Sequence, residues 1–95
     1  MHPMIELTDA RSSVEAMLAE MERAGDTALV IVDRYTRDEG WCWIFFDNSR
    51  AYVEDGDDAE TLAGNGPIVV EKATGRVHEL VTAYPVDDQL ARLRP

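Results

Sequence analysis

The sequence predicts a single α+β domain, with an antiparallel sheet of about five strands, a long N-terminal helix on one face and a short C-terminal helix. Three observations lead to this prediction. The chain begins with a helical apolar pattern, continues with short β-branched and aromatic runs separated by turn residues, and ends with a second helical pattern. A chain of 95 residues can bury one hydrophobic core, so residues 1–95 are expected to form one domain.

The first expected element is a helix over Leu7–Gly25, where apolar residues recur at steps of three and four. Thr8 is expected to cap its start, Asp9 suits the positive end of the helix dipole, and Gly25 offers a left-handed end. The apolar stripe is predicted to cover one face of the sheet. It comprises Leu7, Ala10, Val14, Met17, Leu18 and Met21.

Strands are expected over Thr27–Tyr35, Trp41–Asp47 and Ala51–Glu54, with a polar turn over residues 36–40. The second of these is apolar on both faces, with Trp41, Trp43 and Phe45 on one and Cys42, Ile44 and Phe46 on the other. Such a strand is usually central and covered on both sides. The second face therefore needs cover, either from the C-terminal helix or from another subunit.

The segment Gly64-Asn65-Gly66-Pro67 is predicted to be a sharp corner that starts a strand at Ile68, because Gly and Asn adopt positive φ at little cost. A tight turn with Gly75 at a positive φ is expected to return the chain as a partner strand. The chain then closes with a helix that begins near Pro85. Asp87 and Asp88 lie in its first turn, Arg92 and Arg94 in its last, and Val86, Leu90 and Leu93 on its apolar side.

The charge balance limits the classes of partner. Nineteen Asp and Glu against nine Lys and Arg give a formal net charge of −10, which repels nucleic acid and anionic membranes and favours a basic partner. The single cysteine allows no intramolecular disulfide. No signal-peptide pattern and no apolar run of membrane-spanning length occur, so a cytoplasmic protein is expected.

No catalytic, cofactor or metal site is predicted. Cys42 and His78 could be a thiol and its base, but Cys42 lies within an aromatic strand with no basic neighbour in sequence. The two histidines and the cysteine are too scattered for a zinc site. Gly64-Asn65-Gly66 precedes a strand, whereas a phosphate-binding glycine motif opens a helix. We therefore expect a protein without enzymatic activity and without a cofactor.

Four motifs together resemble the YrhB-type domain, also called the immunity protein 35 family. They are a Gly-Trp-led aromatic strand at Gly40 and Trp41, the corner Gly64–Pro67, the Glu71-Lys72 turn that ends at Gly75, and Thr82 with Pro85 before the last helix. The resemblance extends from Gly40 to about Leu90. It implies a small bacterial protein that binds and neutralises a toxin, and it supplies no catalytic residues.

Two function classes stay open. One is an immunity protein that blocks a cognate toxin, with one tight and salt-sensitive protein partner. The other is a stand-alone chaperone-like or scaffolding domain that binds many unfolded clients weakly. A homodimer that buries Trp41 or Trp43 is a further hypothesis, because exposed aromatic patches usually mark interfaces.

A partner-binding surface is predicted around the densest acidic stretch. An inhibitor with such a loop can mimic the phosphate track that a nucleic-acid-cleaving toxin recognises, although acidic runs are more often solvated loops. Tyr52, Trp41 and Trp43 are the candidate apolar anchors beside it. The acidic residues are Glu54, Asp55, Asp57, Asp58 and Glu60.

Overall fold

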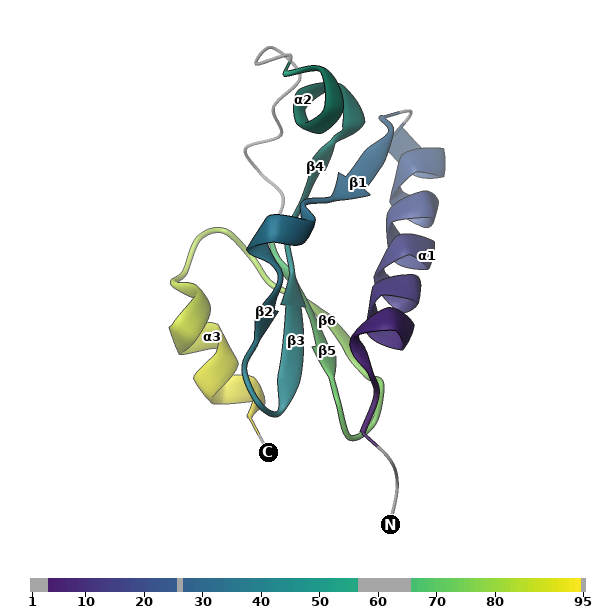
Figure 1. Ribbon diagram of the computed structural model, residues 1–95. Helices are drawn as coiled ribbons and strands as arrows, with labels where there is room; N and C mark the ends of the chain where they lie inside the picture. Colours follow the sequence, from purple (N-terminus) through teal and green to yellow (C-terminus); the bar gives the residue numbers. More distant parts are fainter. Residues whose placement is uncertain (1–3, 26, 57–65, 95) are drawn as a thin grey trace.

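A computed structural model, which describes residues 4–25, 27–56 and 66–94, has the predicted α+β architecture with a long first helix and a short last one (Figure 1). No helix among these residues is long and apolar enough to cross a membrane. The elements in chain order are α1 (Leu7–Gly25), β1 (Leu29–Ile31), the 3₁₀ turn η1 (Asp33–Tyr35), β2 (Arg37–Asp38), β3 (Cys42–Phe45), β4 (Asp47–Ser49), α2 (Arg50–Asp55), β5 (Ile68–Glu71), β6 (Val77–Glu79) and α3 (Val86–Leu93).

The strands form two antiparallel sheets, where the sequence predicted a single sheet of about five strands. One sheet has four strands in the order β2-β3-β5-β6, and the other pairs β1 with β4. The aromatic segment changes partner at Phe46: β3 pairs with β5, with Trp43 opposite Val70, whereas β4 pairs with β1, with Asn48 opposite Val30. One stretch of chain therefore belongs to both sheets.

Helix α1 covers one face of the four-stranded sheet, as predicted (Figure 1). Its buried residues Ala10, Val14 and Leu18 pack with Phe45 and Ile68. Met17 and Met21 add partly buried contacts. Leu7, which was predicted to belong to the stripe, is instead 42% exposed and does not join this core.

The two ends of α1 differ from the prediction. The helical hydrogen bonds begin two residues earlier than a cap at Thr8 would allow, since the Ala10 N–H donates to the Glu6 carbonyl at 3.0 Å. Thr8 therefore lies inside the helix, where its carbonyl accepts from the Ser12 hydroxyl, and does not cap it. Gly25 is the last helical residue and does not adopt a positive φ.

Helix α3 covers the opposite face of the same sheet, so the chain itself supplies the cover that this face needs. Leu90 packs with Cys42, Ile44, Val69 and Leu80 in a second buried cluster. Val86 and Leu93 add to it, so the predicted apolar side of α3 is confirmed. Trp41 also joins this cluster, on the face opposite to the predicted one, because β3 begins only at Cys42 after Gly40 at φ 86°.

Three assignments in the middle of the chain were wrong. The expected strand Ala51–Glu54 is part of α2, which Ser49 caps by accepting the Tyr52 N–H at 3.2 Å and which Gly56 ends at φ 70°. The expected strand Thr27–Tyr35 is strand only at Leu29–Ile31 and turns into η1. The expected polar turn 36–40 contains β2, whose Asp38 lies opposite Trp43.

The predicted corner before β5 works through close backbone contact. Gly64 and Asn65 lie outside the described residues, but Gly66 and Pro67 are buried. Gly66 has no positive φ; instead, a Cβ there would lie 1.7 Å from the Leu80 carbonyl oxygen. The Leu80 N–H donates to the Pro67 carbonyl at 2.8 Å. The β5–β6 hairpin is confirmed, with Gly75 at φ 77°.

Candidate partner-binding surface

Two of the five acidic residues of the predicted site, Glu54 and Asp55, are described by the structure and lie on α2, at the top of Figure 1. Glu54 and Asp55 are exposed on its last turn, and Tyr52 is half-buried. The Arg50 guanidinium lies 3.8 Å from the Glu54 carboxylate, so one of these charges is partly compensated. The predicted site residues Asp57, Asp58 and Glu60 lie outside the described residues. The structure therefore brings Tyr52, Glu54 and Asp55 together on one short helix.

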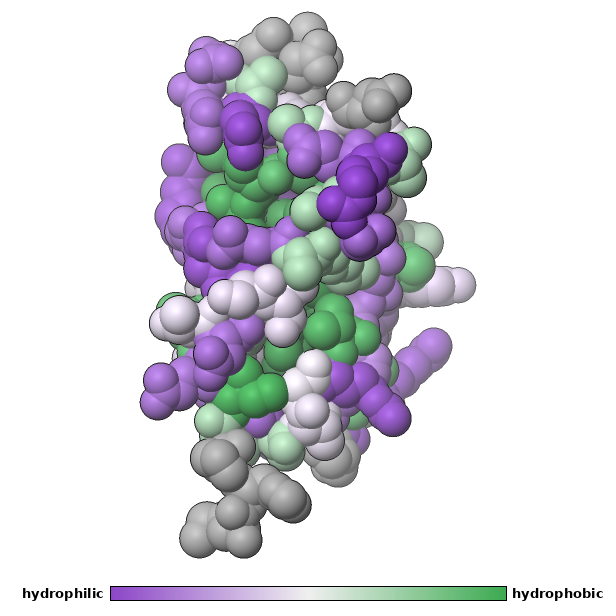
Figure 2. Space-filling view, turned by 90° about the vertical axis from the view of Figure 1, so that its right-hand side faces the viewer, coloured by the Kyte–Doolittle hydropathy of each residue, from purple (hydrophilic) through white to green (hydrophobic). Residues whose placement is uncertain are grey.

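A hollow lies beside this end of the molecule, between α1 and β1. It has a volume of about 220 Å³. Figure 2, which views the molecule from the right of Figure 1, shows recessed apolar surface framed by hydrophilic side chains. The apolar lining comes from Leu18, Ala19, Leu29, Val30 and Ile31, and the charged lining from Arg11, Glu15, Glu22 and Arg50.

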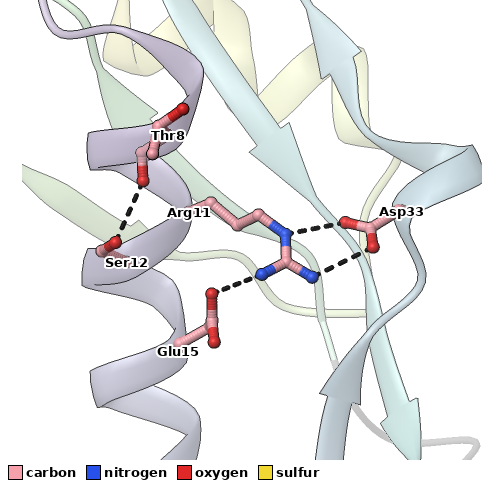
Figure 3. Close-up of polar contacts among 5 residues, drawn as sticks. All are labelled: Thr8, Arg11, Ser12, Glu15 and Asp33. Atoms are coloured by element: carbon pink, nitrogen blue, oxygen red, sulfur yellow. Dashed lines mark hydrogen bonds and ion pairs between the residues drawn. The ribbon is translucent and has the colours of Figure 1, made fainter.

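Arg11 ties α1 to η1 at the mouth of this hollow (Figure 3). Its Nε donates to Asp33 Oδ1 at 2.9 Å and its Nη2 to Asp33 Oδ2 at 3.0 Å, while Nη1 donates to Glu15. The hydrogen bond with Asp33 raises the pKa of Arg11, and the same bond lowers the pKa of Asp33. The bidentate geometry holds η1 in a fixed orientation against the helix.

Trp41 and Trp43 lie around the start of β3, at the other end of the molecule from α2 (Figure 1). Both are half-buried. The Trp43 indole N–H donates to the Ile5 carbonyl at 3.0 Å, and the Lys72 ammonium lies 4.1 Å from the centre of its ring. Lys72 in turn contacts Asp38 at 2.6 Å. The structure thus does not bring the tryptophans beside the acidic helix, and their role in partner binding stays a prediction.

Cys42 is not set up as a nucleophile. Its side chain is fully buried, and burial, followed by the charge of Glu39, raises the pKa of the thiol to about 11. A buried thiol that stays protonated at neutral pH has little reactivity. His78, the candidate base, instead hydrogen-bonds through Nε2 to Glu71 Oε2 at 2.5 Å, across the β5–β6 hairpin. Within the part of the chain that the structure describes, no His, Cys, Asp and Glu residues cluster as metal ligands.

Sequence reasoning missed the hollow and its charged residues on α1. Glu15 and Glu22 lie off the apolar stripe of α1, a position that by itself indicates only exposure to solvent. They are seven residues apart, which places them on the same side of a helix, and this spacing was the available signal. The other wall is β1, and no local pattern could show that β1 would lie opposite them.

Comparisons with known proteins point to one family. A model of the family described as immunity protein 35 matches residues 8–92. The uncharacterized protein YrhB of Escherichia coli (strain K12) is 37% identical over 65 residues, which cover 68% of this chain and 67% of that protein. No solved structure matches the chain.

Proposed function

Because the chain belongs to the immunity protein 35 family, we propose that it neutralises a cognate bacterial toxin by binding it directly. The family match carries this proposal, since an immunity protein implies a protein partner. The alternative of a chaperone-like domain with many clients has no specific observation in its favour. A toxin made by the same cell must be held inactive where it is made, so the proposed place of action is the cytoplasm.

The proposed partner is a basic protein domain. The net charge of −10 supports this, because such a field accelerates encounters with a positively charged surface. The proposed contact surface is α2 with the acidic stretch that begins at Glu54. The cap at Ser49 and the left-handed Gly56 fix both ends of α2, so it can present Glu54 and Asp55 in a defined orientation.

Apolar anchors are needed as well, because exposed charges contribute more to association rate than to affinity. Val53 is 37% exposed, and Tyr52 is half-buried beside it on α2. We propose that these two side chains give the partner an apolar contact next to the two carboxylates.

The test is to read the genes on either side of the one that encodes this chain, and to express the chain together with any toxin-like domain that they encode. We expect growth to be restored and a single complex to be isolated, with an affinity that falls as salt is added. A chain that fails to restore growth, and instead binds a chemically unfolded test protein weakly and without selectivity, would overturn the proposal in favour of the chaperone-like alternative.

A further inference from the structure

We propose that the hollow between α1 and β1 binds one long cationic side chain, an arginine or a lysine, of a basic partner protein. The inference rests on the proposed function for the identity of the partner.

The size of the hollow sets the kind of occupant. A volume of about 220 Å³ holds one large side chain and is too small for a helix or a strand. Leu18 and Ala19 of α1 and Leu29 of β1 give it an apolar lining. Such a surface suits the methylene stem of a lysine or arginine, which stays in apolar contact while the charged head remains near water.

The charges around the hollow favour a cation. Its lining contains two carboxylates and two guanidinium groups, but both guanidinium groups have partners: Arg11 is held by Asp33 and Glu15, and Arg50 lies near Glu54. With Asp33 and Glu54 included, the carboxylates outnumber the cations, and Glu22 contributes a carboxylate directly to the lining. A cationic head group in the hollow would reduce this excess of negative charge.

The open edge of β1 adds hydrogen-bond acceptors. The Val32 N–H donates to the Phe46 carbonyl and the Arg50 N–H to the Ala28 carbonyl, so the even-numbered residues of this segment pair towards β4. Because antiparallel pairing alternates, the carbonyls of Leu29 and Ile31 point away from β4. Both residues line the hollow. An ammonium or guanidinium group there gains acceptors that an apolar side chain cannot use.

The experiment uses the isolated full chain and a small probe, so its outcome does not depend on a toxin. N-acetyl-arginine amide is titrated into labelled protein, and backbone amide shifts are followed by NMR. We expect saturable shifts confined to α1 residues 15–22 and to β1, with a Kd on the order of millimolar. N-acetyl-citrulline amide, which has the same shape without the charge, should cause no such shifts.

Two pairs of variants locate the site. Glu22→Gln should weaken binding about threefold to fivefold, as expected for the loss of one exposed ion pair, whereas Glu20→Gln on the same helix should leave binding unchanged. Ala19→Met should fill the hollow and abolish the shifts, and Ala16→Met, at an exposed position of α1, should not. Shifts spread over the whole acidic surface, or equal effects within each pair, would overturn the inference.

The two proposals fail separately. If the chain restores growth in the presence of the toxin but the probe does not bind the hollow, only this inference falls. If the probe binds the hollow as described but no toxin is neutralised, the proposed function falls and the cation site stands.

Discussion

The two sheets of the molecule are covered differently. The four-stranded sheet has α1 on one face and α3 on the other, and the strands between them hold fully buried residues such as Ile44 and Val69. The two-stranded sheet leaves Leu29 and Val30 half-buried, with the hollow and α2 beside it. The four-stranded sheet is therefore covered on both faces, whereas the two-stranded sheet leaves partly exposed residues that are accessible to a partner.

The described residues of the four sequence motifs lie in the covered part of the molecule. The motif residues that the structure describes serve the four-stranded sheet: Gly40 and Gly75 make its turns, Gly66 lets it close against Leu80, and Pro85 precedes the helix that covers it. None of them lies on α2 or β1. The described motif residues therefore have architectural roles in the four-stranded sheet, and the proposed contact surface contains none of them.

The largest expected effect is at Gly66. Gly66→Ala should destabilise the protein by more than about 3 kcal/mol, because the new Cβ would lie 1.7 Å from the Leu80 carbonyl oxygen and the backbone must move. Gly25→Ala is the matched control and should change the free energy of unfolding by less than about 1 kcal/mol, since no atom lies within 4 Å of its Cβ position. Urea unfolding of both variants measures the difference. Equal effects would mean that the close approach at the corner is not a constraint.

Truncations in the two sheets should also differ. Ile44→Ala removes a fully buried side chain between β3 and α3 and should cost about 2–5 kcal/mol. Val30→Ala, at a half-buried position of β1, should cost about 1 kcal/mol. Comparable losses in a urea titration would show that the two-stranded sheet is as tightly closed as the other.

The buried thiol gives a third contrast. The pKa of Cys42 is raised to about 11, so the folded thiol stays protonated where the unfolded thiol ionises. Its contribution to stability is complete below the unfolded pKa of about 8.5 and is lost as the pH rises towards the folded value. The stability difference between the wild type and Cys42→Ala should therefore shrink above about pH 9. Rapid labelling of the native thiol by a disulfide reagent at pH 8 would contradict this picture of the core.

The smallest effect is expected at the mouth of the hollow. Arg11→Met removes the bidentate contact with Asp33 and should cost less than about 1 kcal/mol, because the pair is exposed. Arg11 lowers the folded pKa of Asp33, so this stability is present above about pH 4, the usual unfolded value, and is lost as the pH falls through the folded pKa. Unfolding curves of the two proteins should converge in acid. A difference that grows in acid would assign Arg11 another role.

Local sequence patterns were sufficient to predict those elements whose apolar period, turn residue or first-turn charges all lie within the element itself. The stripe on α1, the Gly75 turn and the Asp87-Asp88 start of α3 each contain their own cues, and each element formed. The segment Ala51–Glu54 was read as a strand from its residue types, although Ser49 and Gly56 already carried the cap and stop of a helix. In this segment the cap signals at both ends outweigh the β-propensity of the residues between them.

Other features depend on contacts between distant segments. The change of partner at Phe46 follows from where β1 and β5 lie, and a continuous apolar run cannot indicate it. β2 is two polar residues long and exists only because Asp38 and Arg37 pair with β3. The residue types alone predicted one surface of acidic and aromatic residues. However, α2 and the start of β3, which Trp41 directly precedes, lie at opposite ends of the molecule (Figure 1).

The proposed function requires that the carboxylates on α2, Glu54 and Asp55, steer the partner, and not the net charge of the molecule as a whole. The most direct test compares toxin association rates for Glu54→Gln/Asp55→Asn with those for Glu79→Gln/Asp88→Asn, which removes two exposed charges from β6 and α3. We expect the first variant alone to associate severalfold more slowly at low salt and to lose part of its salt dependence, because charges near an interface act mainly on the association rate. Equal slowing in both variants, or an unchanged rate in the first across the salt series, would contradict the account.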